Sequence, residues 1–379
     1  MCKIIVLGAG MVGSAIAIDL AQNHNVTLTD LNDSVLKNVK LKHDFLTIKE
    51  LDVNNEAELQ ETIKQYDLVI CAVPGFLGFN TLKTIINSGM NVIDISFSPE
   101  NLLNLDALAK EKNVTAIVDC GIAPGMDNII LGHCNEKMKL SHFECLVGGL
   151  PKEKKWPFSY KAPFSPIDVI EEYTRPARYV EHGEVVVREP LTDCEYVKFD
   201  KVGTLESFNS DGLRSIIYTM PHIPNMKEKT LRYPGHVEYV RVLKESGFFS
   251  KKKIVVNGHS ILPLDFTSKI LINDWKSGDS EEEFTVMRVT LIGEKGNGKK
   301  EELIYNLYDE YCKDTNTSSM ARTTGYTAAA AANLLLEGLF TEKGVSPPEL
   351  VGKHEICFNY ILKYLEERNI HFVKSSRLI

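Results

Sequence analysis

Two observations predict an α/β protein built from a doubly wound parallel sheet and a second, α+β domain. In the first third of the sequence, short β-branched runs alternate with helical patterns, as in a parallel sheet covered by helices. From about residue 141 the pattern changes to longer strands, hairpin turns and proline-rich loops, which is typical of a mixed α+β domain. The 379 residues are sufficient for two domains. We expect the boundary near residues 120–130.

The predicted elements of the first domain alternate between strand and helix. The helices between the strands include Val12–Gln22, Glu56–Gln65 and Glu100–Glu111. Crossovers between parallel strands are right-handed as a rule, so six strands in this order predict a doubly wound sheet. These strands are Lys3–Leu7, Val26–Thr29, Asp44–Leu51, Leu68–Ala72, Val92–Ile95 and Val114–Val118.

Three further elements are predicted closer to the C-terminus. The charged, glycine-containing segment Glu294–Glu302 is expected to be a solvated hairpin tip between two apolar strands. The alanine-rich stretch Tyr326–Glu337 predicts a helix that ends at Gly338 in a left-handed cap. The last helix, about His354–Arg368, has the apolar spacing of an amphipathic helix.

Composition argues against several classes of partner. There are 43 basic and 51 acidic residues, and the formal charge of -8 disfavours a nucleic-acid surface. The eight cysteines occur singly, without CxxC spacing, so we expect neither a disulfide framework nor a bound metal. No secretory signal or membrane span is apparent. These features predict a cytoplasmic protein that binds neither nucleic acid nor a membrane.

A glycine motif follows the first predicted strand directly. Residues 8–13 read Gly8-Ala9-Gly10-Met11-Val12-Gly13 and open a helix, the context in which a GxGxxG pattern indicates a Rossmann-type dinucleotide site. Gly8 permits the tight turn, Gly10 lets the backbone approach a pyrophosphate, and Gly13 allows close packing of helix on strand. The helix N-terminus offers its free N–H groups to the phosphates.

Acidic and loop residues extend this predicted cofactor site. Asp30 ends the second strand, where a carboxylate accepts hydrogen bonds from the adenosine ribose, and no arginine follows it; NAD is therefore favoured over NADP. Asp52, after the third strand, is a candidate for holding the adenine, although both aspartates can instead cap helices or turns. The remaining candidates follow the fourth and fifth strands, at the ends where such sheets bind ligands: Val73, Pro74, Ser96 and Phe97.

Longer blocks of the sequence resemble a known family. They are DCGIAPGMDN (119–128), VGGLPKE (147–153), YKAPFSPIDVIEEYTRPAR (160–178), ESFNSDGLRS (206–215), TLRYPGH (230–236), SSMARTTGYTAA (318–329) and GVSPPE (344–349). With these blocks, from residue 3 to about 370, the sequence resembles the saccharopine dehydrogenase family, most closely its L-lysine 6-dehydrogenase branch. The resemblance implies a dinucleotide domain (1–125 plus about 318–379), an inserted substrate-binding and dimerisation domain (126–317), and a homodimer.

The resemblance also implies a reaction. In that branch NAD oxidises lysine at its ε-carbon, and hydrolysis of the imine gives allysine and ammonia. A saccharopine or carboxynorspermidine type of dehydrogenase is the alternative, and its pocket needs a further cationic group for the second carboxylate. A non-catalytic NAD-sensing protein is a second alternative.

This chemistry suggests candidate residues. A protonated amine cannot release hydride, so the site needs a base or a desolvating pocket. Asp119 and Asp94, at the carboxyl ends of strands, are candidates for it, and His236 is a candidate proton shuttle. Each of them can instead be structural.

Substrate contacts are predicted in the blocks. Arg214 and Arg232 lie in polar, glycine-flanked segments, and the planar arginine fork suits a carboxylate, although either arginine can instead form a structural ion pair. Asp127 is a candidate for the substrate ammonium or a helix cap, since a helix is expected over Asn128–Lys137. Tyr160 and Lys161 are candidates for substrate contact or proton relay.

Overall fold

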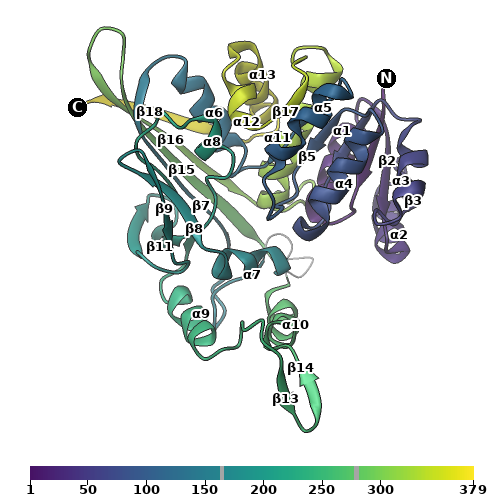
Figure 1. Cartoon of the computed structure of the whole chain (residues 1–379), viewed down its shortest axis with the longest axis horizontal. Coiled ribbons are helices and arrows are strands. Elements are labelled where there is room, and N and C mark those ends of the chain that lie inside the picture. The colour runs from purple at the N-terminus through teal and green to yellow at the C-terminus, as the bar shows by residue number, and fades with distance from the viewer. Residues whose placement is uncertain (163–165, 277–280) are drawn as a thin grey trace.

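The first domain of the computed structural model is a parallel sheet with helices on both faces (Figure 1). The model describes residues 1–162, 166–276 and 281–379. Within these residues the sheet is 7-stranded, in the order β17-β6-β5-β4-β1-β2-β3. Its strands are β1 (Lys3–Leu7), β2 (Asn25–Asp30), β3 (Thr47–Glu50), β4 (Leu68–Cys71), β5 (Val92–Asp94), β6 (Thr115–Ile117) and β17 (Gly344–Ser346). The order of β1 to β6 confirms the predicted doubly wound sheet.

The buried strands are continuous apolar runs because helices cover both faces of a parallel sheet. Ile4 to Leu7 are fully buried in β1. The covering helices are α1 (Met11–Leu20), α2 (Asp33–Lys42), α3 (Glu56–Ile63), α4 (Gly75–Asn87), α5 (Asp106–Glu111) and α11 (Ser319–Leu336). A short 3-10 turn, Leu102–Leu105, precedes α5, so the one helix predicted from Glu100 begins as a tighter turn, which is capped by the side chain of Asn101.

Two further elements depart from their predicted bounds by several residues. The third strand is shorter than Asp44–Leu51, since β3 pairs only over Thr47–Glu50, at the sheet edge. Helix α11 begins at Ser319, earlier than the predicted Tyr326, although Thr and Gly at 323–327 are weak helix formers. Packing accounts for the extension, because a Cβ on Gly325 would lie 3.2 Å from Ile16 of α1. Gly338 has φ 69°, the left-handed conformation that was predicted.

The second domain is a mixed, 9-stranded sheet in the described residues. Its main path runs β10-β11-β12-β7-β15-β16-β18; β8 pairs with β12, and β9 pairs with β8. These strands are β7 (Lys139–Pro151), β8 (Ala177–Glu181), β9 (Glu184–Arg188), β10 (Glu195–Phe199), β11 (Gly203–Asn209), β12 (Met226–Arg232), β15 (Glu283–Glu294), β16 (Lys300–Glu310) and β18 (Phe372–Leu378). The hairpin predicted around residues 294–302 joins β15 to β16.

The second domain also contains helices and a separate hairpin. The helices are α7 (Pro166–Thr174), α8 (Ile216–Thr219), α9 (His236–Glu245) and α10 (Pro263–Trp275). The hairpin of β13 (Ile254–Val256) and β14 (His259–Ile261) extends away from the rest of the protein in Figure 1. Residues 163–165 of the resemblance block 160–178 lie outside the described residues. No helix in the described part of the sequence is long and apolar enough to cross a bilayer.

The C-terminal segment adds a strand to each of the two sheets. Strand β17 is a parallel partner of β6, and β18 pairs with β16 at the edge of the mixed sheet. The predicted division assigned residues 318–379 to the first domain, and the structure differs from it at β18. The predicted last helix is α13 (Glu355–Glu366), which packs beside α11.

Helices α6 (Met126–Asn135) and α12 (Pro348–Gly352) cross at glycines on both sides. A Cβ on Gly132 would lie 2.0 Å from the Glu349 carbonyl oxygen, and one on Gly352 would lie 2.2 Å from that of Ile129. The backbones therefore touch, and neither position has room for a methyl group.

The variant Gly132→Ala should separate α6 from α12. Overpacking of this kind costs about 1–3 kcal/mol, so we expect a melting temperature at least about 2 °C below that of the parent protein. The matched control is Gly296→Ala, at a hairpin tip where a Cβ meets nothing within 4 Å. Equal melting temperatures for the two variants would contradict the tight crossing.

Candidate active site

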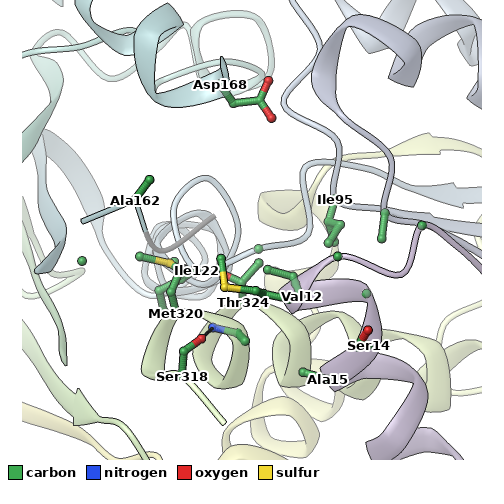
Figure 2. A pocket seen from close by; sticks show the side chains of 18 of the residues that line it. Val12, Ser14, Ala15, Ile95, Ile122, Ala162, Asp168, Ser318, Met320 and Thr324 are labelled. Atoms are coloured by element: carbon green, nitrogen blue, oxygen red, sulfur yellow. Dashed lines mark hydrogen bonds between the residues drawn. The ribbon is translucent and has the colours of Figure 1, made fainter. Parts of the chain in front are cut away.

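One large cavity, of about 1190 Å³, joins the carboxyl ends of the parallel strands to the mixed sheet. Its wall includes the glycine loop, the loops after β4, β5 and β6, strand β12 and the start of α11. In Figure 2, Val12, Ile122, Met320 and Thr324 gather at the floor, and the Asp168 carboxylate of α7 points in from the opposite side. Both domains therefore build this cavity.

The glycine loop has the shape that a dinucleotide requires. Gly8 has φ +105°, and a Cβ there would lie 2.4 Å from the Ala72 carbonyl oxygen. A Cβ on Gly13 would lie 2.0 Å from the Gly8 oxygen, so helix α1 packs directly on the turn. A Cβ on Gly10 meets nothing within 4 Å, and the N-terminus of α1 is not capped by a side-chain hydrogen bond. The open space at Gly10 and the free helix N-terminus fit a pyrophosphate.

Asp30 lies at the end of β2 against the same loop. Its Oδ2 accepts a hydrogen bond from the Ala9 N–H at 2.8 Å, and its Oδ1 accepts one from the Asn32 N–H. Asp30 lines the cavity, and so does the exposed Lys42 at the end of α2. Asp52 is not on this wall; its Oδ1 accepts hydrogen bonds from Asn54 and forms a turn after β3.

All the other predicted cofactor residues lie on the cavity wall: Met11, Val12, Val73, Pro74, Ser96 and Phe97. Asp94 lies behind Ser96, fully buried, and accepts the Ser96 hydroxyl at 2.8 Å. Burial raises the pKa of Asp94 to about 7. Because it does not reach the wall, its direct role as a base is not supported by this placement.

Asp119 faces the cavity from the loop after β6 and forms a buried ion pair with Arg214. Arg214 Nε and Nη2 donate to the two Asp119 oxygens at 3.3 and 3.0 Å, and Nη1 donates to the Ser98 carbonyl. Both residues have positive φ, 51° and 50°. The Arg214 guanidinium is therefore hydrogen-bonded to Asp119 and Ser98 of the first domain. Arg214 is not among the residues that line the cavity.

Arg232, at the end of β12, is the buried cation of the cavity wall. Its Nη2 donates to Glu172 at 2.8 Å and to the Tyr160 hydroxyl, Nε donates to the Tyr173 hydroxyl, and Nη1 donates to the Leu231 carbonyl. The guanidinium also lies 4.4 Å from the centre of the Tyr160 ring. Tyr160 thus holds Arg232 rather than lining the cavity itself.

His236 and Lys161 also lie away from the cavity wall. The His236 ring nitrogens are hydrogen-bonded to the Phe158 carbonyl and the Tyr173 hydroxyl, both at 2.9 Å. Burial lowers the pKa of His236 to about 3, so the ring is neutral and positions Tyr173, and a proton-shuttle role is not supported. Lys161 donates to the Asp274 carbonyl at 2.5 Å.

Strand β12 supplies residues that the sequence prediction omitted. Glu228, Thr230 and Arg232 alternate along the strand and all line the cavity, as expected for one face of a strand. The run MKEKTLR has polar residues on both faces, because Lys227 and Lys229 lie between the cavity-facing residues, so the sequence alone does not single out this face. Glu172, Asp168 and Asp211 also line the cavity and were omitted.

Asp127 is buried in the first turn of α6, close enough to Glu228 to raise its pKa. Its Oδ1 accepts the Gly125 N–H at 2.9 Å, so it caps the helix from inside the first turn. Burial raises the pKa of Asp127 to about 7, and that of Glu228 well above its usual value. Among the described residues, no group of three or more His, Cys, Asp or Glu side chains could hold a metal ion.

Two family models match nearly the whole sequence. The saccharopine dehydrogenase NADP binding domain matches residues 4–117, and the saccharopine dehydrogenase C-terminal domain matches residues 121–370.

Named relatives are distant in sequence. The mitochondrial alpha-aminoadipic semialdehyde synthase of Rattus norvegicus is 24% identical over 421 residues, which cover 91% of this protein and 45% of the relative. The protein thus spans about half the length of that relative. Carboxyaminopropylagmatine dehydrogenase of Synechocystis sp. is 21% identical, with 91% and 92% coverage. A solved saccharopine dehydrogenase (L-Glu forming) from Saccharomyces cerevisiae has the same fold, with a TM-score of 0.80 at 20% identity over 100% of both proteins.

The glycine loop allows stability and cofactor binding to be separated. Gly10 has φ -65°, which alanine adopts readily, so Gly10→Ala should keep its melting temperature. The methyl group enters the open space, and we expect binding of NAD, measured by calorimetry, to weaken at least about tenfold. Gly13→Ala, which meets the Gly8 oxygen, should lower both stability and binding. Wild-type NAD affinity in Gly10→Ala would contradict the assignment of this loop.

Proposed function

Because this protein belongs to the saccharopine dehydrogenase family, we propose that it oxidises an amino acid at the terminal carbon–nitrogen bond of its side group, with L-lysine as substrate and allysine as product. The observation that carries the proposal is the single cavity that connects the glycine loop with Glu228 and Arg232 of β12. A dinucleotide bound at the loop and an amine held by β12 then share one cavity.

Different residues of the cavity wall bind the two ends of the substrate and accept its proton. The nicotinamide supplies the hydride acceptor when the dinucleotide is bound. Arg232 orients the carboxylate end of the substrate, and the carboxyl groups of the wall attract its ammonium end and accept the proton that must leave before oxidation. Asp119 remains a candidate for that proton because a carboxylate has about four acceptor positions, and Arg214 occupies only part of them.

The balance of charge favours lysine over saccharopine. Saccharopine carries further carboxylates, which call for further cations in the pocket. Of the cationic side chains that line the cavity in the described residues, Lys42 and Lys276 are exposed and Arg232 is buried. Glu172 already neutralises part of the charge of Arg232. A substrate with one carboxylate and two amines suits this wall best.

NAD is the proposed cofactor. Asp30 supports this choice, because its carboxylate repels a 2′-phosphate. The matching family model is named for NADP, and Lys42 lies on the same wall, so a direct comparison of the two cofactors is required. We also propose a cytoplasmic homodimer, with contacts largely from the second domain.

A panel of substrates and cofactors tests the function. We expect reduction of NAD, followed by absorbance, with L-lysine in preference to saccharopine, ornithine and carboxynorspermidine. NADP should give a lower kcat/KM than NAD, and Asp30→Ala should weaken NAD binding by about 1 to 3 kcal/mol. Tighter binding of NADP would contradict the cofactor assignment, and NAD binding without turnover of any amine would favour a sensing role.

Arg232 is expected to bind the substrate carboxylate. Loss of a buried, charge-assisted contact costs about 2 to 5 kcal/mol, so Arg232→Ala should lower kcat/KM for L-lysine by roughly 30-fold to several thousand-fold. Arg232→Lys should recover part of this loss, because an ammonium balances Glu172 but cannot make all the hydrogen bonds of the guanidinium.

The control for Arg232 is cadaverine, which lacks the carboxylate. Its oxidation should fall far less than that of L-lysine in the same variants. Equal losses for both substrates, together with a large drop in melting temperature, would show that Arg232 only supports Glu172, Tyr160 and Tyr173.

A further inference from the structure

Glu228 is a buried carboxyl group whose charge is balanced by no protein cation among the described residues. It is 4% exposed, and its Oε2 has no hydrogen-bond partner in that part of the structure. The residue lies on the cavity wall. A buried polar atom without a partner is costly, so a partner supplied by a ligand is the simplest physical account of its position.

The backbone around Glu228 is shaped to admit its carboxyl group. A Cβ on Gly212 would lie 1.9 to 2.1 Å from the carboxyl carbon and both oxygens. Any larger residue at 212 would displace the carboxyl from this place. The glycine therefore keeps Glu228 against the wall of the cavity.

The groups that surround Glu228 make its site favourable for a cation. Asp127 of α6, Asp211 after β11 and Glu172 of α7 all raise its pKa, and Arg214 opposes them more weakly, after the dominant effect of burial. Asp211 is paired with Arg178, Glu172 with Arg232, and Arg214 with Asp119. These pairs cancel one another in charge. Glu228 and Asp127 are left without a cation among the described residues.

Strand geometry places this carboxyl at a fixed separation from Arg232. The two residues are four positions apart on the same face of β12, which puts their Cα atoms about 13 Å apart. Thr230 lies between them on the wall. A linear substrate with an anionic end at Arg232 can thus extend along the strand toward Glu228.

We propose that Glu228 binds the side-chain ammonium of the substrate and makes the site selective for amines with a cationic nitrogen at that end. The inference rests on the proposed function for the identity of the substrate, but not for the charge that Glu228 recognises. An ammonium provides the hydrogen-bond donor and the positive charge that Oε2 lacks. Glu228 then acts as a specificity-determining residue that touches the substrate.

Two matched pairs of ligands test the charge selectivity without turnover. L-norleucine is L-lysine without the ε-nitrogen, and n-pentylamine has the same relation to cadaverine. In calorimetric titrations of the full-length protein without dinucleotide, we expect the ligand with the extra ammonium to bind on the order of 10- to 100-fold more tightly. In Glu228→Gln this preference should fall to about twofold or less.

The stability of the variant separates recognition from a structural role. The folded-state pKa of Glu228 is raised, so the folded state holds the proton more tightly, and this contribution to stability is lost as the pH rises from the unfolded value toward the folded one. Glutamine cannot ionise and therefore avoids this loss, so the melting temperature of Glu228→Gln at neutral pH should be equal to or above that of the parent protein.

The matched control is Glu349→Gln. Glu349 is equally buried, burial also raises its pKa, and it contacts Asn128 and Thr219 rather than the cavity. This control should keep the full preference for the additional ammonium. Preference retained in Glu228→Gln, lost equally in Glu349→Gln, or absent from the parent protein with both ligand pairs would overturn the inference. Selective binding without oxidation of any amine would contradict the proposed function and leave the role of Glu228 intact.

Discussion

The cavity depends on one buried ion pair, between Asp119 and Arg214. It joins the loop after β6 to the segment before α8, and a third bond to the Ser98 carbonyl ties in the loop after β5. Removal of either partner would leave a buried charge, which typically costs about 3–5 kcal/mol. The left-handed backbone of both residues is part of the same constraint. The pair thereby fixes the wall of the mixed sheet relative to the cofactor end.

The carboxyl groups in and beside the cavity fall into two groups, with and without an arginine partner. Asp119, Asp211 and Glu172 each face an arginine, whereas Glu228, Asp127 and Asp94 face none in the described residues. In the first group the arginine pairs hold the carboxyl groups in place, whereas burial raises the pKa of the second group, which holds protons more readily. An enzyme that must bind an ammonium and then remove its proton can use carboxyl groups of both kinds.

Local patterns predicted the cofactor half of the molecule well. The bounds of β1 agree with the prediction, and the glycine loop has the shape that its sequence implies, because turn, strand and helix are decided by neighbouring residues. Strands β17 and β18 were missed because their partners are far away in the sequence. The substrate half was harder for the same reason. Whether Arg214 meets a ligand or Asp119 is decided by the fold, and no local pattern carries that information.

The placement of β17 and β18 has a consequence for the order of folding. Domains generally fold as they leave the ribosome, beginning with the N-terminal one. Here the parallel sheet lacks its strand next to β6, and the mixed sheet lacks its strand next to β16, until the segment after α11 has been synthesised. Strands β6 and β16 are therefore edge strands during translation, and a single late segment supplies the final edge strand of each sheet. The two sheets are therefore completed at the same stage of synthesis, because both last strands lie in the segment after α11.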